Sequence, residues 1–157
     1  EMMQMGPFLR LRGGLQSPEE FAESIWSNVL VQLLGVGTSD GKPLVWLRCD
    51  RGSAAANHAA ISVARLEQGL ISLRAASAVA AFIEYLFTNF EFRKLYLEVP
   101  EVNLEQFESV AGHVAMEEGR LRDHLRHGDR YIDLVIMSLW ADHWYGSPLR
   151  ESLLDRL

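Results

Sequence analysis

The chain has 157 residues, of which 48% are hydrophobic and 23% are charged, and a formal net charge of −6. This composition is typical of one globular domain with a buried core, and the acidic balance argues against a nucleic-acid partner, which would need clustered Lys and Arg. A single cysteine, Cys49, excludes an internal disulfide framework and suits a reducing, cytoplasmic location. No apolar run approaches the roughly 20 residues that cross a bilayer, so we expect no membrane partner. The start EMMQMGP lacks the pattern of a signal peptide.

The first half of the chain predicts a helix followed by a β-meander. Ser17-Pro18-Glu19-Glu20 is a helix start, because Ser17 can cap, Pro18 fits the first helical position and Glu20 completes a capping box. The β-rich runs that follow predict three antiparallel strands, at residues 29–36, 43–50 and 58–66. The small and polar residues of 51–57 predict a loop.

Residues 73–112 predict a helix–strand–helix unit around which the rest of the chain is organised. Apolar side chains recur at helical spacing, which predicts a packed helix at about 75–90 whose buried stripe is Ala78, Ala81, Phe82, Tyr85 and Leu86. Residues 94–99 alternate as a strand does, with Leu95, Leu97 and Val99 on one face and Tyr96 and Glu98 on the other. Asn103 is expected to cap the next helix.

The last third predicts two further strands and a polar end. Short strand 113–116 is followed by a charged loop over 117–130, a central strand over 131–139 and a helical turn at 140–144, and the chain after Gly146 is expected to be loose. The whole predicts an α+β fold: a mixed, mostly antiparallel sheet flanked by helices. We expect one domain over residues 15–145, between an extension or cloning remnant at 1–14 and a tail at 146–157.

This order, with FIEYLFTNFEFRKLYLEV and the run EEGRLRDHLRHGDRYIDLVIMSL, resembles the GNAT superfamily of acyl-CoA-dependent N-acyltransferases. The branch that it resembles most includes ribosomal-protein alanine acetyltransferases, and the resemblance covers about residues 15–144. It implies a splayed sheet into which a CoA thioester inserts between the family's fourth and fifth strands. It also implies acetyl-CoA or another acyl-CoA as co-substrate, and an amine of a small molecule or a protein as acceptor.

The cofactor site that the resemblance implies departs from the family pattern. A turn R/Q-x-x-G-x-G/A usually precedes the central helix, where its N–H groups hold the pyrophosphate. Here it falls on residues 70–75 without either glycine, which leaves Ser72, Leu73, Arg74 and Ala75 as the cofactor-binding candidates. Asn103 can hold the CoA arm in such proteins, or can serve only as a helix cap. The family's tyrosine acid falls on Val110, and its first strand and helix lie upstream of anything present here, so the domain looks shortened.

The catalytic candidates are Glu98 and His58, each of which could take a proton from the amine. Their alternatives are a solvent-facing carboxylate on a strand and a surface histidine at a strand start. A backbone N–H within residues 61–66 is expected to polarise the thioester carbonyl. The three histidines His113, His124 and His127 lack metal-site spacing, so we expect no metal.

Two functions therefore stay open on the sequence. The first is an N-acyltransferase with an atypical cofactor site. The second is a catalytically inert module of the same fold that acts in dimerisation or partner binding. A homodimer is expected, since a shortened domain exposes surface that a second copy could cover.

Overall fold

The computed structural model describes residues 17–24, 27–37, 40–53, 55–66, 72–105, 107 and 114–156. Its elements, in chain order, are α1 (Pro18–Ser24), β1 (Val29–Val36), β2 (Pro43–Ser53), β3 (His58–Arg65), α2 (Leu73–Asn89), β4 (Lys94–Pro100), the 3₁₀ turn η2 (Glu101–Asn103), β5 (Ala115–His127), β6 (Arg130–Trp140), α4 (Ala141–Tyr145) and α5 (Pro148–Leu154). The predicted extension at 1–14, the turn residues 70 and 71, Val110 and His113 lie outside the described residues.

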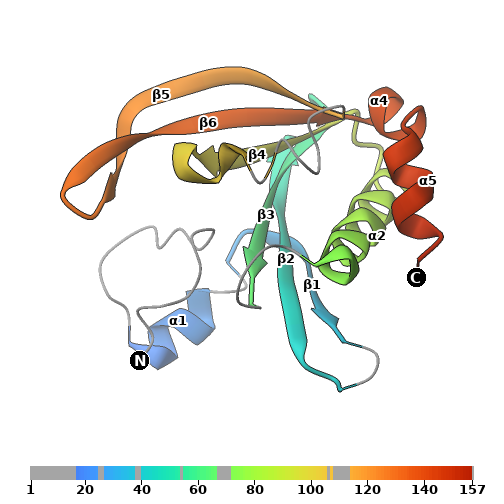
Figure 1. Cartoon of the computed structure of the whole chain (residues 1–157), viewed down its shortest axis with the longest axis horizontal. Coiled ribbons are helices and arrows are strands. Elements are labelled where there is room, and N and C mark those ends of the chain that lie inside the picture. The colour runs from blue at the N-terminus through green and yellow to red at the C-terminus, as the bar shows by residue number, and fades with distance from the viewer. Residues whose placement is uncertain are drawn as a thin grey trace.

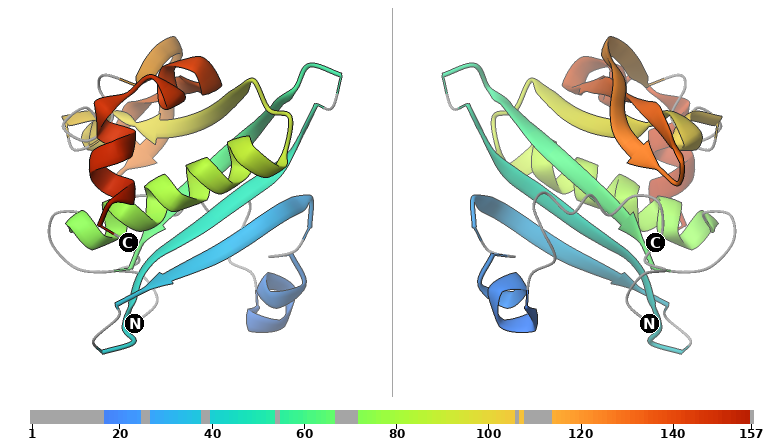
Figure 2. Two further views of the ribbon diagram at one scale, coloured as in Figure 1. Left: turned by 90° about the vertical axis from the view of Figure 1, so that its right-hand side faces the viewer. Right: turned by 90° about the vertical axis from the view of Figure 1, so that its left-hand side faces the viewer.

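The six described strands form one sheet in the order β1-β2-β3-β4-β6-β5. Among them β3 and β4 form the one parallel pair, and the other neighbours are antiparallel. Helix α2, followed by α4 and α5, covers one face of the sheet, whereas α1 lies on the opposite side (Figures 1 and 2). The predicted α+β class, with a mixed and mostly antiparallel sheet, is confirmed.

Helix α1 begins as the sequence predicts. The N–H of Glu20 donates to Ser17 Oγ at 3.1 Å, and the N–H of Ser17 donates to Glu20 Oε2 at 2.8 Å. This reciprocal pair is a capping box, which satisfies two N–H groups that a helix start otherwise leaves without partners.

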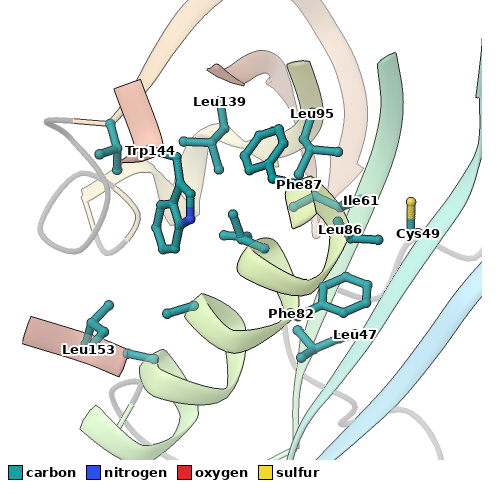
Figure 3. Packing of buried hydrophobic residues seen from close by; sticks show 14 of the residues in the cluster. Leu47, Cys49, Ile61, Phe82, Leu86, Phe87, Leu95, Leu139, Trp144 and Leu153 are labelled. Carbon is teal, nitrogen blue, oxygen red and sulfur yellow. The ribbon is translucent and has the colours of Figure 1, made fainter. Parts of the chain in front are cut away.

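The main core lies between α2 and the sheet, where Phe82 and Leu86 contact Leu47, Ile61 and Leu95 (Figure 3). The buried stripe of α2 differs from the predicted one. Tyr85 is 43% exposed, whereas the stripe also contains Ala76, Ile83 and Phe87. The reason is that α4 and α5 cover a second side of α2, through Trp144 and Leu153, and so the buried surface turns toward them.

Two loop predictions are wrong. Residues 117–127 belong to β5, which pairs with β6 along its length, and residues 51–53 extend β2. β5 forms the outer edge of the sheet and exposes most of its side chains on both faces, so its sequence lacks the alternation that marks a half-buried strand. At Gly52 the backbone of β2 lies so close to the start of β3 that a Cβ there would overlap the carbonyl oxygen of His58. Only glycine fits this position.

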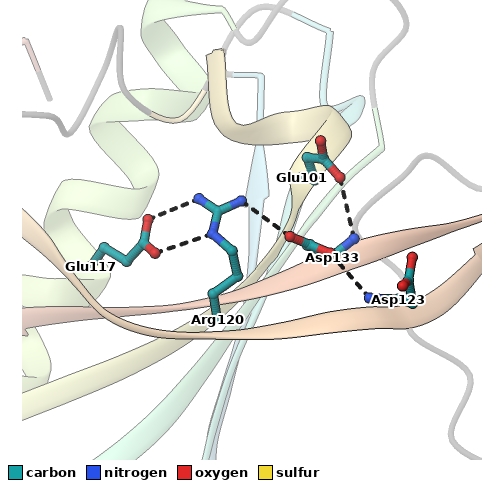
Figure 4. A network of polar contacts seen from close by, with 5 residues as sticks. All are labelled: Glu101, Glu117, Arg120, Asp123 and Asp133. Carbon is teal, nitrogen blue, oxygen red and sulfur yellow. Dashed lines mark hydrogen bonds and ion pairs between the residues drawn. The ribbon is translucent and has the colours of Figure 1, made fainter.

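A network around Asp133 shapes the β5–β6 hairpin (Figure 4). Asp133 Oδ1 accepts from the N–H of Asp123 at 3.0 Å, and its Oδ2 lies 3.5 Å from Arg120, which also binds Glu117. Asp123 adopts a φ of 49°, a left-handed conformation at the point where the β5–β6 register shifts. The N–H of Asp133 donates to Glu101 at 3.2 Å. The GNAT-like run at 117–133 thus builds a bulged hairpin.

The expectation of a loose chain after Gly146 is also wrong. Ser147 caps α5 by accepting from the N–H of Leu149 at 3.1 Å, and Leu153 is buried against α2. Arg150 donates to both carboxylate oxygens of Glu84 on α2 at 2.7 Å. This mostly polar segment therefore contains helix α5, which a bidentate ion pair attaches to α2. The domain limits themselves stay a prediction.

We predict that Glu84→Gln lowers the melting temperature at neutral pH and that its difference from wild type shrinks in acid. The Arg150 hydrogen bonds hold the pKa of Glu84 below its usual value, against the effect of burial and with help from Trp144. A lowered folded-state pKa gives stability that is complete above the unfolded-state value of about 4.3 and is lost as the pH falls through the folded value. Thermal melts from neutral pH to about pH 3 measure this. An equal difference at every pH would contradict it.

Candidate functional site

The parallel strands β3 and β4 meet only at their first residues. His58–Ile61 pairs with Lys94–Leu97, and the pairing stops there. β3 continues to Arg65 beside β2, and β4 continues to Pro100 beside β6. The two strands leave their common start in different directions (Figure 1). The sheet is therefore splayed beyond the Ile61–Leu97 pair.

Backbone hydrogen bonds determine which groups of β3 face this gap. The carbonyl of Asn57 accepts from Arg93 on the β4 side at 2.8 Å, and the N–H of Leu66 donates to Leu44 on the β2 side at 2.9 Å. Because backbone groups alternate along a strand, odd-numbered residues of β3 face β4 and even-numbered residues face β2. Beyond the last pair, the N–H and C=O groups of Val63 therefore point into the gap. This narrows the predicted carbonyl-polarising segment at 61–66 to the N–H groups of Val63 and Arg65, of which that of Val63 lies nearer the last β3–β4 pair.

The N-terminus of α2 lies at the open end of the splay. Ser72 is its N-cap, and Ser72 Oγ accepts from the N–H of Ala75 at 3.1 Å. The N–H of Ala75 is thus engaged within the helix, and its side chain is fully buried. Leu73, 62% exposed, and Arg74, also exposed, carry the first two N–H groups of the helix. Of the four cofactor candidates in this turn, Leu73 and Arg74 present their N–H groups outward, where the positive end of the helix favours an anion.

A further cation near this end, Arg65, escaped the sequence analysis. Ala59 and Ile61 pack in the core beneath α2, and because side chains alternate, Arg65 lies on the same face of β3. It is the last residue of the strand and directly neighbours Val45 of β2, next to the point where Ala78 of α2 approaches Gly35. A single basic residue at a strand end gives too weak a signal for sequence analysis to find.

The two predicted bases are not brought together. Glu98 is exposed and lies one residue beyond the last β3–β4 pair, on the face opposite α2. His58 lies at the closed end, roughly 10 Å from Ile61 at the rise of a strand, with its ring edge-on to Tyr96 at 5.3 Å between centroids. Glu98 is thus beside the gap, and His58 is not. Asn103 is 2% exposed in η2, just past the end of β4.

An ion pair between a buried lysine and a partly exposed glutamate adjoins the closed end. Lys94 is 7% exposed, and its Nζ donates to the two oxygens of Glu118 at 2.8 and 3.1 Å. The ammonium also lies 4.4 Å from the ring centroid of Tyr96 and 4.7 Å from that of Trp140. Hydrogen bonding to Glu118 raises the pKa of Lys94, and the same contact lowers the pKa of Glu118. Both groups stay charged at neutral pH, so neither is suited to proton transfer.

The described residues also show the state of Cys49 and whether a metal site or a membrane-spanning helix is present. Cys49 is fully buried, and this burial, with a smaller effect of Asp50, raises its thiol pKa to about 12, which keeps it from acting as a nucleophile. Within the described ranges, His, Cys, Asp and Glu do not gather in any group of three or more that could hold a metal ion. The described helices include none that is long and apolar enough to span a membrane.

Comparisons with known proteins agree with this architecture. Scans against protein-family models and curated proteins find no match. Among solved structures, the chain is similar to a mutant of the spermidine N-acetyltransferase SpeG from Vibrio cholerae, with 17% identity, a TM-score of 0.67, and 82% of this chain and 75% of that chain covered. A chimera of this SpeG with hSSAT gives 16% identity and a TM-score of 0.68 over 82% of this chain and 77% of that one. The spermidine/spermine N-acetyltransferase SpeG from Vibrio cholerae with manganese ions gives 17% and 0.65, over 88% and 75%.

These likenesses establish the class of fold. The chain has the GNAT fold that the sequence predicts, the fold of N-acetyltransferases, with its splayed parallel pair formed by β3 and β4. The narrower resemblance to ribosomal-protein alanine acetyltransferases stays a prediction.

Proposed function

We propose that the chain is an acyl-CoA-dependent N-acyltransferase that transfers an acyl group, with acetyl as the first choice, to an amine of a small molecule or a protein. The observation that carries this proposal is the separation of β3 from β4 beyond Ile61 and Leu97, which leaves the backbone of Val63 directed into the gap. An extended thioester arm between the strands could satisfy such strand groups. The N-acetyltransferase names of the structural neighbours support the same class.

In this proposal each part of the site has one role. The N–H groups of Leu73 and Arg74, with the Ser72 cap and the Arg74 guanidinium, hold the CoA phosphates, and Asn103 stays a candidate for the CoA arm. The N–H of Val63 polarises the thioester carbonyl. The amine nitrogen attacks the carbonyl carbon, the C–N bond forms, the C–S bond breaks, and CoA leaves as a thiolate that takes up a proton. Glu98 is the preferred base for the amine proton, and His58 is the weaker candidate because it lies at the closed end.

The inert module stays the second candidate. It is supported by the phosphate-binding turn at residues 70–75, which lacks both glycines of the family pattern. Against it, the strands still separate, and the helix start still offers two N–H groups beside an arginine. Positioning and backbone donors supply much of the catalysis of acyl transfer, so the missing side-chain acid does not remove the main contributions.

We predict that Arg74→Glu weakens acetyl-CoA binding by about tenfold or more, because it replaces a cation with an anion beside the CoA phosphates. Isothermal titration of the variant and of wild type measures the two dissociation constants. Arg122→Glu makes the same charge change on the exposed part of β5 and is the matched control, for which we expect affinity near that of wild type. Equal losses in both variants would mean that net charge, and not the start of α2, governs binding. Wild-type affinity in Arg74→Glu would exclude this placement of the phosphates.

A panel of amines tests the reaction itself. Release of CoA thiol from acetyl-CoA in the presence of one acceptor, lost when that acceptor is omitted, would support the enzyme. Tight CoA binding without turnover on small amines or amino-terminal peptides would favour the inert module.

A further inference from the structure

The gap between β3 and β4 opens although both strands continue past it. β3 stays paired with β2 as far as Arg65, and β4 stays paired with β6 as far as Pro100. The ladder that the two strands share ends earlier, at the pair of Ile61 and Leu97. The opening is therefore a property of the edge that β3 and β4 share, and not of the place where either strand ends.

Hydrogen-bond phase shows which backbone groups of β4 face β3. The N–H of Ala141 donates to the carbonyl of Arg93 at 3.0 Å, one step before the first pair of the antiparallel β4–β6 register. Because backbone groups alternate along a strand, odd-numbered residues of β4 face β6 and even-numbered residues face β3. Pro100, the last residue of β4, is even-numbered. Its nitrogen therefore faces β3, and its place beside β6 requires no N–H.

The parallel register, if it continued, would bring Pro100 to Val63. In a parallel ladder, the carbonyl of a residue accepts from the N–H that follows its partner, and its own N–H donates to the carbonyl that precedes the partner. Two steps beyond the 61–97 pair, the partner of Val63 would be Val99, so the carbonyl of Val63 would accept from residue 100. Proline has no N–H, and a ring carbon takes the place of that hydrogen. Val63 can therefore make at most one of its two hydrogen bonds to β4.

We propose that Pro100 is a positioning residue that holds the gap between β3 and β4 open. It withholds the N–H that would join β4 to Val63, so the backbone groups of Val63 are left to a ligand. Pro100 also has a φ of −58°, far from the roughly −120° of a parallel strand, and the turn η2 follows it directly. The consequence for acetyl-CoA rests on the proposed function, whereas the consequence for strand pairing does not.

Hydrogen exchange of Pro100→Ala in the absence of ligand tests the effect on pairing. Alanine restores the N–H, so we expect the ladder to extend by the two backbone hydrogen bonds of Val63. Exchange at the Val63 amide should slow by about tenfold relative to wild type, and the new amide at residue 100 should be protected too. Pro148→Ala makes the same substitution at the exposed start of α5, so it is the matched control and should leave the exchange rate of Val63 unchanged. Pro100→Val restores the same N–H with a strand-favouring side chain and should act like Pro100→Ala.

Isothermal titration with acetyl-CoA gives a second readout. A ligand that enters the gap of Pro100→Ala has to break the restored bonds, so its dissociation constant should rise by about tenfold or more, while Pro148→Ala stays near wild type. Circular dichroism checks that the variants remain folded. Wild-type exchange at Val63 in folded Pro100→Ala and Pro100→Val would overturn the proposal. A Val63 amide already protected in wild type without ligand would also overturn it, because its groups would then be engaged despite the proline. If wild type bound no acetyl-CoA, only the proposed function would fail, since the exchange result stands without it.

Discussion

Glu118→Gln is expected to destabilise the fold by about 2 kcal/mol, below the range for removing one partner from a fully buried ion pair. The substitution leaves the ammonium of Lys94 in a site that is 7% exposed and without a carboxylate. The rings of Tyr96 and Trp140 offset part of this loss through cation–π contacts. The effect is not larger because the Glu118 side chain is 31% exposed and keeps some contact with water. Urea denaturation measures the free energy of unfolding.

The neighbouring carboxylate gives the control. Glu117 binds Arg120 at 2.9 Å, but its side chain is 45% exposed, so Glu117→Gln should cost less than about 1 kcal/mol. A second control adds Lys94→Met to Glu118→Gln, which keeps an apolar stem between the rings and removes the unpaired charge. This double variant should recover much of the lost stability. If the two glutamines had equal effects, Lys94 would not be the buried, carboxylate-dependent group described above.

Val63→Pro is expected to lower the rate of acyl transfer by about 10² to 10³, the effect of removing one preorganised donor from an oxyanion site. Proline lacks an N–H, and the N–H of Val63 faces the gap between β3 and β4. The substitution therefore removes the proposed carbonyl donor without removing a hydrogen bond to β2, and proline is tolerated in strands at such positions. The turnover number with the best acceptor from the amine panel measures the effect.

Two variants separate this role from packing. Val63→Ala shortens the side chain but retains the N–H, so it should keep most of the turnover. Ala64→Pro removes an N–H that faces β2, so it should unfold the sheet. If Val63→Ala lost as much activity as Val63→Pro in a folded protein, the backbone donor would not be the reason.

Local signals in the sequence were sufficient for the elements that are determined locally. The capping box at Ser17 and Glu20 and the alternation of residues 94–99 depend on neighbours a few residues away, and the structure confirms them. The pattern at 147–148 repeats the Ser-Pro start of α1, and could have indicated α5. It was missed because the composition after Gly146 is mostly polar.

Features that depend on distant residues could not be predicted. The order β4-β6-β5 brings Lys94 to Glu118 across β6, and alternation within β4 gives no indication of it. The buried stripe of α2 also faces α4 and α5, which lie more than fifty residues further along the chain. For the candidate site, the family pattern indicated the turn before α2. It did not indicate which backbone N–H groups of β3 point toward β4. Only the hydrogen bonds of Asn57 and Leu66 distinguish the N–H of Val63 from its neighbours.

Calorimetric titration of wild-type protein with acetyl-CoA tests the central claim most directly, because every role assigned to the gap requires that a CoA thioester enters it. The account predicts saturable binding at micromolar strength that Arg74→Glu weakens and Arg122→Glu does not. The absence of heat and of any thermal shift at millimolar acetyl-CoA would contradict it. The fold would then stand as a module without its cofactor.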